Sequence, residues 1–239
     1  MKPLSIIIPC YNEGKDIENR LAKLKDYLNL NRIDAEIICV SDGSKDDTLE
    51  KLKGVDGVTA YGYENNLGKG GAVRYGVERA NGEYCLFMDA DLSTDLKAIS
   101  DIMPLFREFD FIIGSRHERG SEIVKKQPLK RVFIGWCCRQ IVGYKFKFRY
   151  KDTQCGFKAI KTSLAKEIAK RQIINGFAFD VEYLYIAKLN GVKVKEIPVV
   201  WADDRSSTVM PIKSSVAFFK DLGKIKKNAE NYRFVSDKI

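Results

Sequence analysis

Short apolar runs rich in isoleucine and valine alternate along the chain with segments in which apolar residues recur every three or four positions. The first kind of segment is typical of buried strands, and the second of amphipathic helices. Their alternation predicts an α/β protein with a parallel sheet covered by helices. The 239 residues can form one domain, because no linker or low-complexity tract divides them.

The periodicity places the elements along the chain as follows. The predicted strands are residues 4–9, 36–40, 58–62, 84–88, 110–114, 157–161 and 192–201. The predicted helices are residues 17–28, 68–80, 94–109, 163–170 and 180–190, with a basic amphipathic helix from residue 213 onward. Ligands of such sheets bind beyond the carboxyl ends of the strands. Pro9, Asp42 and Asp89 stand at three such ends, so we expect them to face one crevice.

Asp89 and Asp91 directly follow the apolar run of residues 84–88. Because side chains alternate along a strand, the two carboxylates share one face and can reach the same divalent cation. Carboxylate oxygens suit Mg²⁺ or Mn²⁺, and a site with few protein ligands leaves room for the phosphates of a substrate. A solvated loop is the alternative interpretation, and the position at a strand end favours the metal site.

The positive charge is concentrated in one segment. Residues 116–151 hold eleven lysines and arginines and two glutamates, which accounts for the whole formal net charge of +9. Aromatic and aliphatic residues are interleaved with these charges, a mixture typical of a basic amphipathic element at an anionic lipid surface. A solvated helix packed on the core is the alternative. No nucleic acid is expected as a partner, because no nucleic-acid motif accompanies the charge.

The six cysteines lie mostly within apolar runs, and we recognise no secretory leader before them. We therefore expect reduced cysteines in a cytoplasmic protein. A zinc site is disfavoured, because His117 is the only histidine and no Cys-x-x-Cys pair is present. No apolar stretch approaches the roughly 18 residues of a spanning helix, so any membrane contact is expected to be peripheral.

The turn after the first strand offers three groups to a nucleotide. Pro9 fixes the chain at the strand exit, the ring of Tyr11 can face a base or ribose, and Glu13 can accept hydrogen bonds from ribose hydroxyls. Helix capping by residues 12 and 13 is an alternative role. Residues 46–48 are expected to start the next helix and stay outside the site.

Lys69 lies among Gly68, Gly70 and Gly71. Glycine lets backbone N–H groups approach a phosphate and lysine adds positive charge, so we interpret this segment as phosphate-binding. It is not a Walker loop, because Gly71 stands where serine or threonine is required. It is not a dinucleotide fingerprint either, because Val73 occupies the third glycine position.

Four segments resemble, in order and spacing, the family 2 glycosyltransferases of the GT-A fold: Ser5–Glu13, Val40–Thr48, Asn66–Ala72 and Asp89–Asp91. Two further segments, Asp152–Lys158 and Phe179–Glu182, are similar to the branch of dolichyl-phosphate glucosyltransferases and polyprenyl-phosphate sugar synthases. The resemblance covers nearly the whole chain. It implies a Rossmann-like, mixed and mainly parallel sheet sandwiched by helices, with basic amphipathic helices at a membrane interface.

On the donor side, the resemblance implies that Asp42 accepts a hydrogen bond from a base N–H. It implies that Asp89, Ala90 and Asp91 bind the donor, with Asp89 and Asp91 on the metal and Asp91 as the direct ligand. Many relatives add a glutamine two residues further on. This chain has Ser93 there, which can instead cap the next helix.

A late segment, Trp201 with residues 205–207, resembles a family loop that closes over the donor diphosphate. Arg205 would then counter the charge of the leaving group, and Ser206 would face the acceptor. A surface turn is the alternative interpretation.

On the acceptor side, Arg116 and Arg131 match positions that bind the acceptor phosphate in polyprenyl-phosphate synthases, and guanidinium groups suit that geometry. For Arg131 a solvated basic face is the alternative. Asp152 and Gln154 are expected to line the acceptor site and place the reacting centre. A lipid phosphate, with a second pKa of about 6, is already an anionic nucleophile at neutral pH. With a hydroxyl acceptor, Asp152 and Asp180 would be the candidate bases.

The resemblance predicts an inverting, Mg²⁺- or Mn²⁺-dependent glycosyltransferase with Asp91, Asp152 and Gln154 as its catalytic residues. Glucose from UDP-glucose is the favoured donor, and a polyprenyl or dolichyl phosphate at the cytosolic face of a membrane is the acceptor. A soluble enzyme with a hydroxyl acceptor is one alternative. A non-catalytic nucleotide-binding scaffold is another, disfavoured by the presence of the acceptor-site residues. A homo-oligomer is left open.

Within the single domain, three parts are expected to divide the work. Residues 1–115 would bind the nucleotide sugar, residues 116–212 the acceptor, and residues 213–239 would form the basic C-terminal helix.

Overall fold

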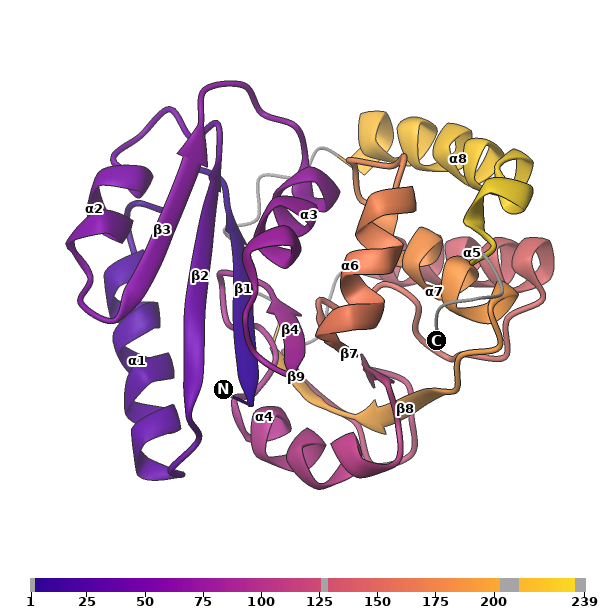
Figure 1. Ribbon diagram of the computed structural model, residues 1–239. Helices are drawn as coiled ribbons and strands as arrows, with labels where there is room; N and C mark the ends of the chain where they lie inside the picture. Colours follow the sequence, from indigo (N-terminus) through magenta and orange to yellow (C-terminus); the bar gives the residue numbers. More distant parts are fainter. Residues whose placement is uncertain (1–2, 126–128, 203–210, 235–239) are drawn as a thin grey trace.

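A seven-stranded sheet in the order β3-β2-β1-β4-β7-β5-β8 runs through the computed structural model, which describes residues 3–125, 129–202 and 211–234 (Figure 1). The strands of this sheet are β1 (Leu4–Cys10), β2 (Ala35–Asp42), β3 (Val58–Tyr63), β4 (Tyr84–Met88), β5 (Phe111–Ser115), β7 (Phe157–Lys161) and β8 (Val194–Pro198). A separate parallel pair joins β6 (Glu122–Lys125) to β9 (Val200–Ala202).

Strand β7 is antiparallel to both of its neighbours, β4 and β5, whereas the other neighbouring pairs of the large sheet are parallel. The first residues of β7 therefore lie at the edge where the six other strands end. The chain that enters β7 arrives beside the residues that leave β4. The predicted mixed, mainly parallel sheet is confirmed.

Helices cover both faces of the sheet. They are α1 (Ile17–Leu30), α2 (Thr48–Gly54), α3 (Lys69–Arg79), α4 (Lys97–Ile102), α5 (Leu129–Phe146), α6 (Thr162–Arg171), α7 (Phe179–Leu189) and α8 (Pro211–Lys227), with two 3₁₀ turns, η1 (Met103–Arg107) and η2 (Ala229–Tyr232).

The core has two parts, one on each face. On one face, alternate residues of β1 pack with the apolar stripe of α1, formed by Ile17, Leu21, Leu24 and Leu28, and with α4. On the other face, α3, α6 and α7 pack on the sheet, and α5, α8 and η2 add residues to the same cluster. Helix α7 is buried from Phe179 to Ala187, as expected of a helix that is enclosed by other elements.

Several predicted elements differ in detail. The helix predicted at residues 94–109 is the short helix α4 followed by η1, in which Pro104 cannot donate a backbone hydrogen bond. The strand predicted at residues 192–201 is divided at Val199 into β8 and β9, which belong to different sheets. The basic segment contributes β6 and the long helix α5, and the C-terminal helix begins at Pro211.

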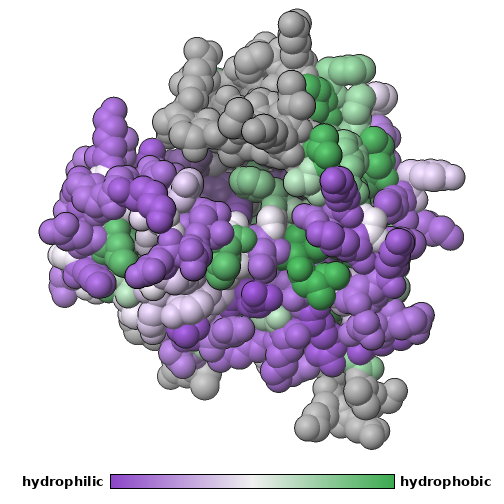
Figure 2. Space-filling view, turned by 90° about the horizontal axis from the view of Figure 1, so that it is seen from above, coloured by the Kyte–Doolittle hydropathy of each residue, from purple (hydrophilic) through white to green (hydrophobic). Residues whose placement is uncertain are grey.

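Helix α5 presents apolar side chains to solvent. Phe133, Trp136, Ile141 and Tyr144 are exposed, and Tyr144 is 91% exposed. Seen from above, hydrophobic residues gather mainly on the right of the molecule, the side on which α5 and α8 lie (Figure 2). In the part of the chain that the structure describes, we find no helix with the length and apolarity needed to cross a bilayer.

Candidate functional site

The three strand ends predicted to share a crevice lie at one edge of the sheet. Pro9 lies in β1, Asp42 is the last residue of β2, and Asp89 directly follows β4. Pairing in register aligns these strands, with Pro9 opposite Val40 and Ile7 opposite Phe87. The paired parallel strands therefore bring Pro9, Asp42 and Asp89 to the same edge of the sheet.

Asp42 is 3% exposed and shapes the loop that leads to α3. Its carboxylate accepts hydrogen bonds from the Tyr63 hydroxyl and from the backbone N–H groups of Leu67 and Gly68, each at 2.8 Å. A carboxylate has about four acceptor positions, so these donors leave about one for a nucleotide base. The carboxylate thus fixes the backbone immediately before Lys69.

Lys69 begins α3 and forms an ion pair with Asp89. Gly68 precedes it with φ +98°, a conformation that glycine adopts without strain. Burial lowers the pKa of Lys69, but the negative charges of Asp89, Asp180 and Asp91 outweigh burial and hold the pKa above its ordinary value. Lys69 is therefore a permanent cation beside the two candidate metal ligands.

Asp91 lies on a tight turn in which Leu92 has φ +52°. Its Oδ1 accepts a hydrogen bond from the backbone N–H of Ser93 at 2.9 Å. The suggested capping role of Ser93 is wrong, because α4 begins only at Lys97 and has no side-chain cap. Ser93 is buried instead, and its carbonyl accepts from the N–H of Ala202 at 2.8 Å, which places the end of β9 beside the acidic turn.

The turn after β1 is held by side chains of α1 and α2. The N–H of Glu13 donates to the Thr48 hydroxyl at 2.9 Å, and the carboxylate of Glu13 pairs with Arg20 of α1 at 2.6 Å. Tyr11 is 42% exposed, so its ring face is accessible. As predicted, Thr48 begins α2.

Asp152 forms a largely buried ion pair with Arg116. Its side chain is 1% exposed, and Arg116 approaches it with Nε at 2.6 Å from Oδ2 and Nη2 at 2.9 Å from Oδ1. The N–H groups of Arg116 and Gln154 donate to the same carboxylate. Burial raises the pKa of Asp152, but Arg116 outweighs burial and holds the pKa well below its ordinary range. Asp152 is therefore an anion that holds Arg116 in place.

Gly156 lies against the turn that carries Asp89 and Asp91. A side chain at Gly156 would overlap the carboxylate of Asp89, so the Gly156 backbone lies directly against that carboxylate. Asp89 consequently contacts Lys69 on one side and the Gly156 backbone on the other. The donor-side and acceptor-side motifs meet at this one carboxylate.

A buried ion pair behind this contact was missed by the sequence reasoning. Lys158 of β7 is fully buried, pairs with Asp180 at 2.7 Å and donates to the Cys155 carbonyl at 2.6 Å. Burial raises the pKa of Asp180, although Lys158 and Lys69 act in the opposite direction. A lysine inside a predicted buried strand was the signal that could have revealed the pair.

Three predicted residues fall outside these contacts. Arg205 and Ser206 lie outside the described residues, and Arg131 belongs to α5 without a described side chain. The chain enters residues 203–210 from β9, whose Trp201 ring lies 5.3 Å from the Arg116 guanidinium.

The donor set at the acidic turn fits a hard divalent cation. Asp89 and Asp91 supply carboxylate oxygens from one short turn, which suits Mg²⁺ or Mn²⁺ when water and phosphate oxygens fill the other positions. Within the described ranges, no group of three or more histidine, cysteine, aspartate or glutamate side chains could hold a metal ion.

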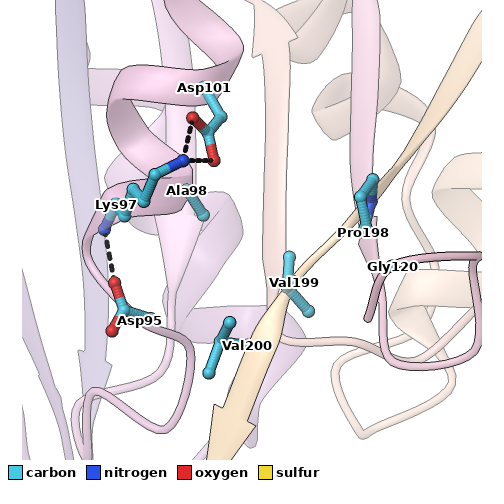
Figure 3. A pocket seen from close by; sticks show the side chains of 8 residues that line it. All are labelled: Asp95, Lys97, Ala98, Asp101, Gly120, Pro198, Val199 and Val200. Carbon is cyan, nitrogen blue, oxygen red and sulfur yellow. Dashed lines mark hydrogen bonds and ion pairs between the residues drawn. The ribbon is translucent and has the colours of Figure 1, made fainter. Parts of the chain in front are cut away.

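A separate cavity of about 270 Å³ lies between α4 and the β8–β9 connection (Figure 3). Lys97 lies beside it, with its ammonium hydrogen-bonded to Asp101 and its backbone N–H to Asp95. The cavity is lined by Asp95, Lys97, Ala98, Asp101, Gly120, Pro198, Val199 and Val200. None of the predicted site residues lines it.

Comparison with known proteins gives consistent matches. The family described as Glycosyl transferase family 2 matches residues 5–170. A dolichyl-phosphate beta-glucosyltransferase of Dictyostelium discoideum is 32% identical over 93% of this chain and 73% of its own length. One from Mus musculus is 33% identical over 92% of this chain and 74% of its own length.

Among solved structures, glucosyl-3-phosphoglycerate synthase from Mycobacterium tuberculosis shares the fold. Its complex with UDP superposes with a TM-score of 0.68 over 98% of this chain and 82% of that chain, at 15% identity. Its complex with Mn²⁺, UDP-glucose and phosphoglyceric acid gives a TM-score of 0.67 over 98% and 81%, also at 15% identity.

Proposed function

The chain is a glycosyltransferase that belongs to glycosyl transferase family 2, and on that premise we propose that it transfers glucose from UDP-glucose to a dolichyl or polyprenyl phosphate. The transfer would proceed by in-line displacement with inversion. The relatives that match over most of the chain are dolichyl-phosphate glucosyltransferases, which supports both the sugar and the acceptor. The solved complex with UDP-glucose shows that this fold accommodates such a donor.

The observation that carries the proposal is the position of Asp89 between Lys69 and Gly156. Lys69 follows the glycine-rich donor loop, and Gly156 ends the segment that begins with Asp152. A glycosyl transfer requires donor and acceptor to meet within bonding distance. The contact of both motifs with one carboxylate provides that meeting point.

The donor side assigns a role to each residue. Asp89 and Asp91, with Ala90 between them, would hold Mg²⁺ or Mn²⁺, which neutralises the diphosphate as it departs. Lys69 adds a fixed positive charge beside that position. We assign Pro9, Tyr11 and Glu13 to the nucleoside, Asp42 to the base, and Arg205 to the leaving diphosphate.

The acceptor side favours a phosphate over a hydroxyl. A hydroxyl acceptor needs a general base, and the low pKa of Asp152 makes that carboxylate a poor one. Asp180 is buried in an ion pair with Lys158. A lipid phosphate needs no such base, because it is largely dianionic above a pKa of about 6. Arg116, Arg131 and Ser206 would bind it, with Asp152 and Gln154 holding Arg116 and the reacting centre.

The arrangement of the chain supports a peripheral position on the cytosolic face of a membrane. Residues 116–151 hold the whole net positive charge, and α5 exposes apolar side chains next to it. A basic surface with exposed aromatic residues suits a bilayer that contains anionic lipids. We also assign residues 1–115 to the donor and residues 116–212 to the acceptor, with residues 213–239, which include most of α8, adding basic surface.

The decisive experiment incubates the protein with Mn²⁺ and labelled UDP and GDP sugars, with and without citronellyl phosphate. We expect glucose from UDP-glucose in the lipid product and no turnover without the phosphate. Asp91→Asn should abolish transfer, because it removes a charge from the metal site. Asp101→Asn, an equal change at an exposed position of α4, should leave transfer intact.

Circular dichroism would establish that the Asp91 variant is folded. Lipid-independent transfer to a hydroxyl compound would replace the acceptor in this proposal. Full turnover by folded Asp91→Asn would remove the acidic turn from the mechanism.

A further inference from the structure

Arg139 is a guanidinium group of α5 to which no motif assigned a role. It precedes Val142 and Phe146 by three and seven residues, and both are buried, so the three share one flank of the helix. The guanidinium extends toward the preceding turn of the helix, and its Nη1 lies 3.8 Å from the position that a Cβ at Gly135 would occupy. The side chain is half-buried on the flank of α5 that faces the protein.

The neighbours of Arg139 are the charged groups of the acceptor side. Burial lowers the pKa of Arg139, the carboxylate of Asp152 acts in the opposite direction, and the charge of Arg116 lowers the pKa further. The pKa of His117 is lowered by burial and then by Arg139. These four groups therefore lie within electrostatic reach of one another.

The cluster has an excess of positive charge. Asp152 is engaged by the Nε and Nη2 groups of Arg116 and by two backbone N–H groups. Over the ranges 3–125, 129–202 and 211–234, the Arg139 guanidinium makes no hydrogen bond or ion pair. Arg116 contacts the Asp152 carboxylate and Arg139 lies within its electrostatic reach, so two guanidinium groups share one carboxylate. A half-buried guanidinium that makes no hydrogen bond to a carboxylate favours binding of an anionic ligand.

We propose that Arg139 binds the phosphate group of the acceptor together with Arg116. The proposal rests on the proposed function and adds a residue to its acceptor site. A phosphate monoester carries close to two negative charges at neutral pH, more than Arg116 alone can balance while it holds Asp152. Arg139 supplies the second cation from α5, whereas Arg116 directly follows β5. The apolar side chains of α5 lie on its other face, so a prenyl chain can follow the helix while its phosphate turns inward.

The test compares three variants that change one side chain each. Arg139→Gln removes the charge, Arg139→Lys keeps it, and Arg149→Gln removes an equal charge from an exposed position in the same basic segment. Calorimetry would measure binding of citronellyl phosphate without donor. Steady-state kinetics would give KM for citronellyl phosphate and for UDP-glucose separately.

We expect Arg139→Gln to weaken citronellyl phosphate binding about tenfold or more, the range of a hydrogen bond to a charged group. Arg139→Lys should recover part of that loss, and the KM for UDP-glucose should stay unchanged. If Arg139→Gln and Arg149→Gln weaken binding equally, the charge acts at long range and the assignment is wrong. If the wild-type protein itself neither binds nor glucosylates citronellyl phosphate, the acceptor proposal and this one both fall.

Discussion

The absence of a side chain at Gly156 leaves room for the carboxylate of Asp89. The backbone of Gly156 occupies the space next to the Asp89 carboxylate, and any Cβ there would displace it. Lys158 stabilises the backbone next to Gly156 by donating a hydrogen bond to the Cys155 carbonyl. The position of the Asp89 carboxylate, a proposed metal ligand, therefore depends on a glycine and a lysine 67 and 69 residues further along the chain.

We predict that Gly156→Ala impairs catalysis far more than stability. The added methyl group displaces Asp89, and misplacement of a reacting group by about 1 Å can cost about 10²-fold in rate. We expect a loss of that size in kcat/KM and a raised requirement for Mn²⁺. The matched control is Gly54→Ala, where the new methyl group meets nothing within 4 Å. An unaltered manganese dependence in folded Gly156→Ala would contradict this explanation.

The Lys158–Asp180 pair leads to a stability prediction. Lys158→Met leaves Asp180 buried without its nearest cation, and removal of one partner of a buried pair costs about 3–5 kcal/mol. Urea unfolding should show this loss in the free energy of unfolding. Lys161→Met removes a half-exposed lysine from the end of the same strand, where a surface pair contributes about 0–1 kcal/mol. Equal losses in the two variants would mean that burial of the pair is irrelevant.

At the scale of elements, α5 has two different faces. Val142 and Phe146 pack into the core, and the ring of Phe146 lies 4.9 Å from that of Tyr185 in α7. On the opposite face Phe133, Trp136 and Tyr144 are exposed. An interfacial helix places its apolar face in the boundary between lipid headgroups and acyl chains.

We predict that the double substitution Phe133→Ser and Trp136→Ser weakens binding to vesicles with anionic lipid by about tenfold or more, since each buried aromatic side chain contributes roughly 1.5–3 kcal/mol. Co-sedimentation would measure the binding. Transfer to soluble citronellyl phosphate should be unaffected. Leu30→Ser, at an apolar position of α1 that is 83% exposed, is the control. Loss of both activities together would show that the substitutions damage the fold.

At the scale of the whole molecule, the two core clusters protect most of the thiols. Cys10, Cys39, Cys85 and Cys155 are buried, whereas Cys137 and Cys138 of α5 are half-buried. Burial raises the pKa of Cys85 and Cys155 to about 11. At pH 8 these two groups are almost entirely uncharged thiols, and the thiolate is the form that reacts.

Iodoacetamide at pH 8 should therefore modify Cys137 and Cys138 in the folded protein and leave the four buried cysteines intact. Addition of urea should make all six reactive. Mass spectrometry of tryptic peptides would identify the modified residues. Early modification of Cys85 or Cys155 without denaturant would contradict the burial described for these two residues.

The sequence predicts the edge of the sheet better than the connections across it. The isoleucine-rich run of β1 and the apolar run before Asp89 define where strands end, because buried parallel strands require continuous apolar residues. The ion pair between Arg116 and Asp152 joins residues 36 apart, and no local pattern encodes that distance. The direction of β7 is likewise invisible in periodicity, because parallel and antiparallel buried strands share the same pattern.

The missed Lys158 has a related physical reason. A lysine in a strand is normally assigned to the exposed face, and only its partner on another element makes burial tolerable. Asp180 comes from α7, beyond the reach of a local interpretation. The prediction of one long helix at residues 94–109 is wrong for a simpler reason, because that range includes Pro104, which lies in η1.

The bridge between Arg116 and Asp152 closes the basic segment at its base, where β5 ends and β7 is about to begin. The segment between these two residues is also attached elsewhere, because β6 pairs with β9 and because Val142 and Phe146 of α5 pack into the core. A segment of a related enzyme grafted between the same arginine and aspartate would therefore have to reproduce the contacts with β9 and with the core before its effect on the proposed acceptor could be measured.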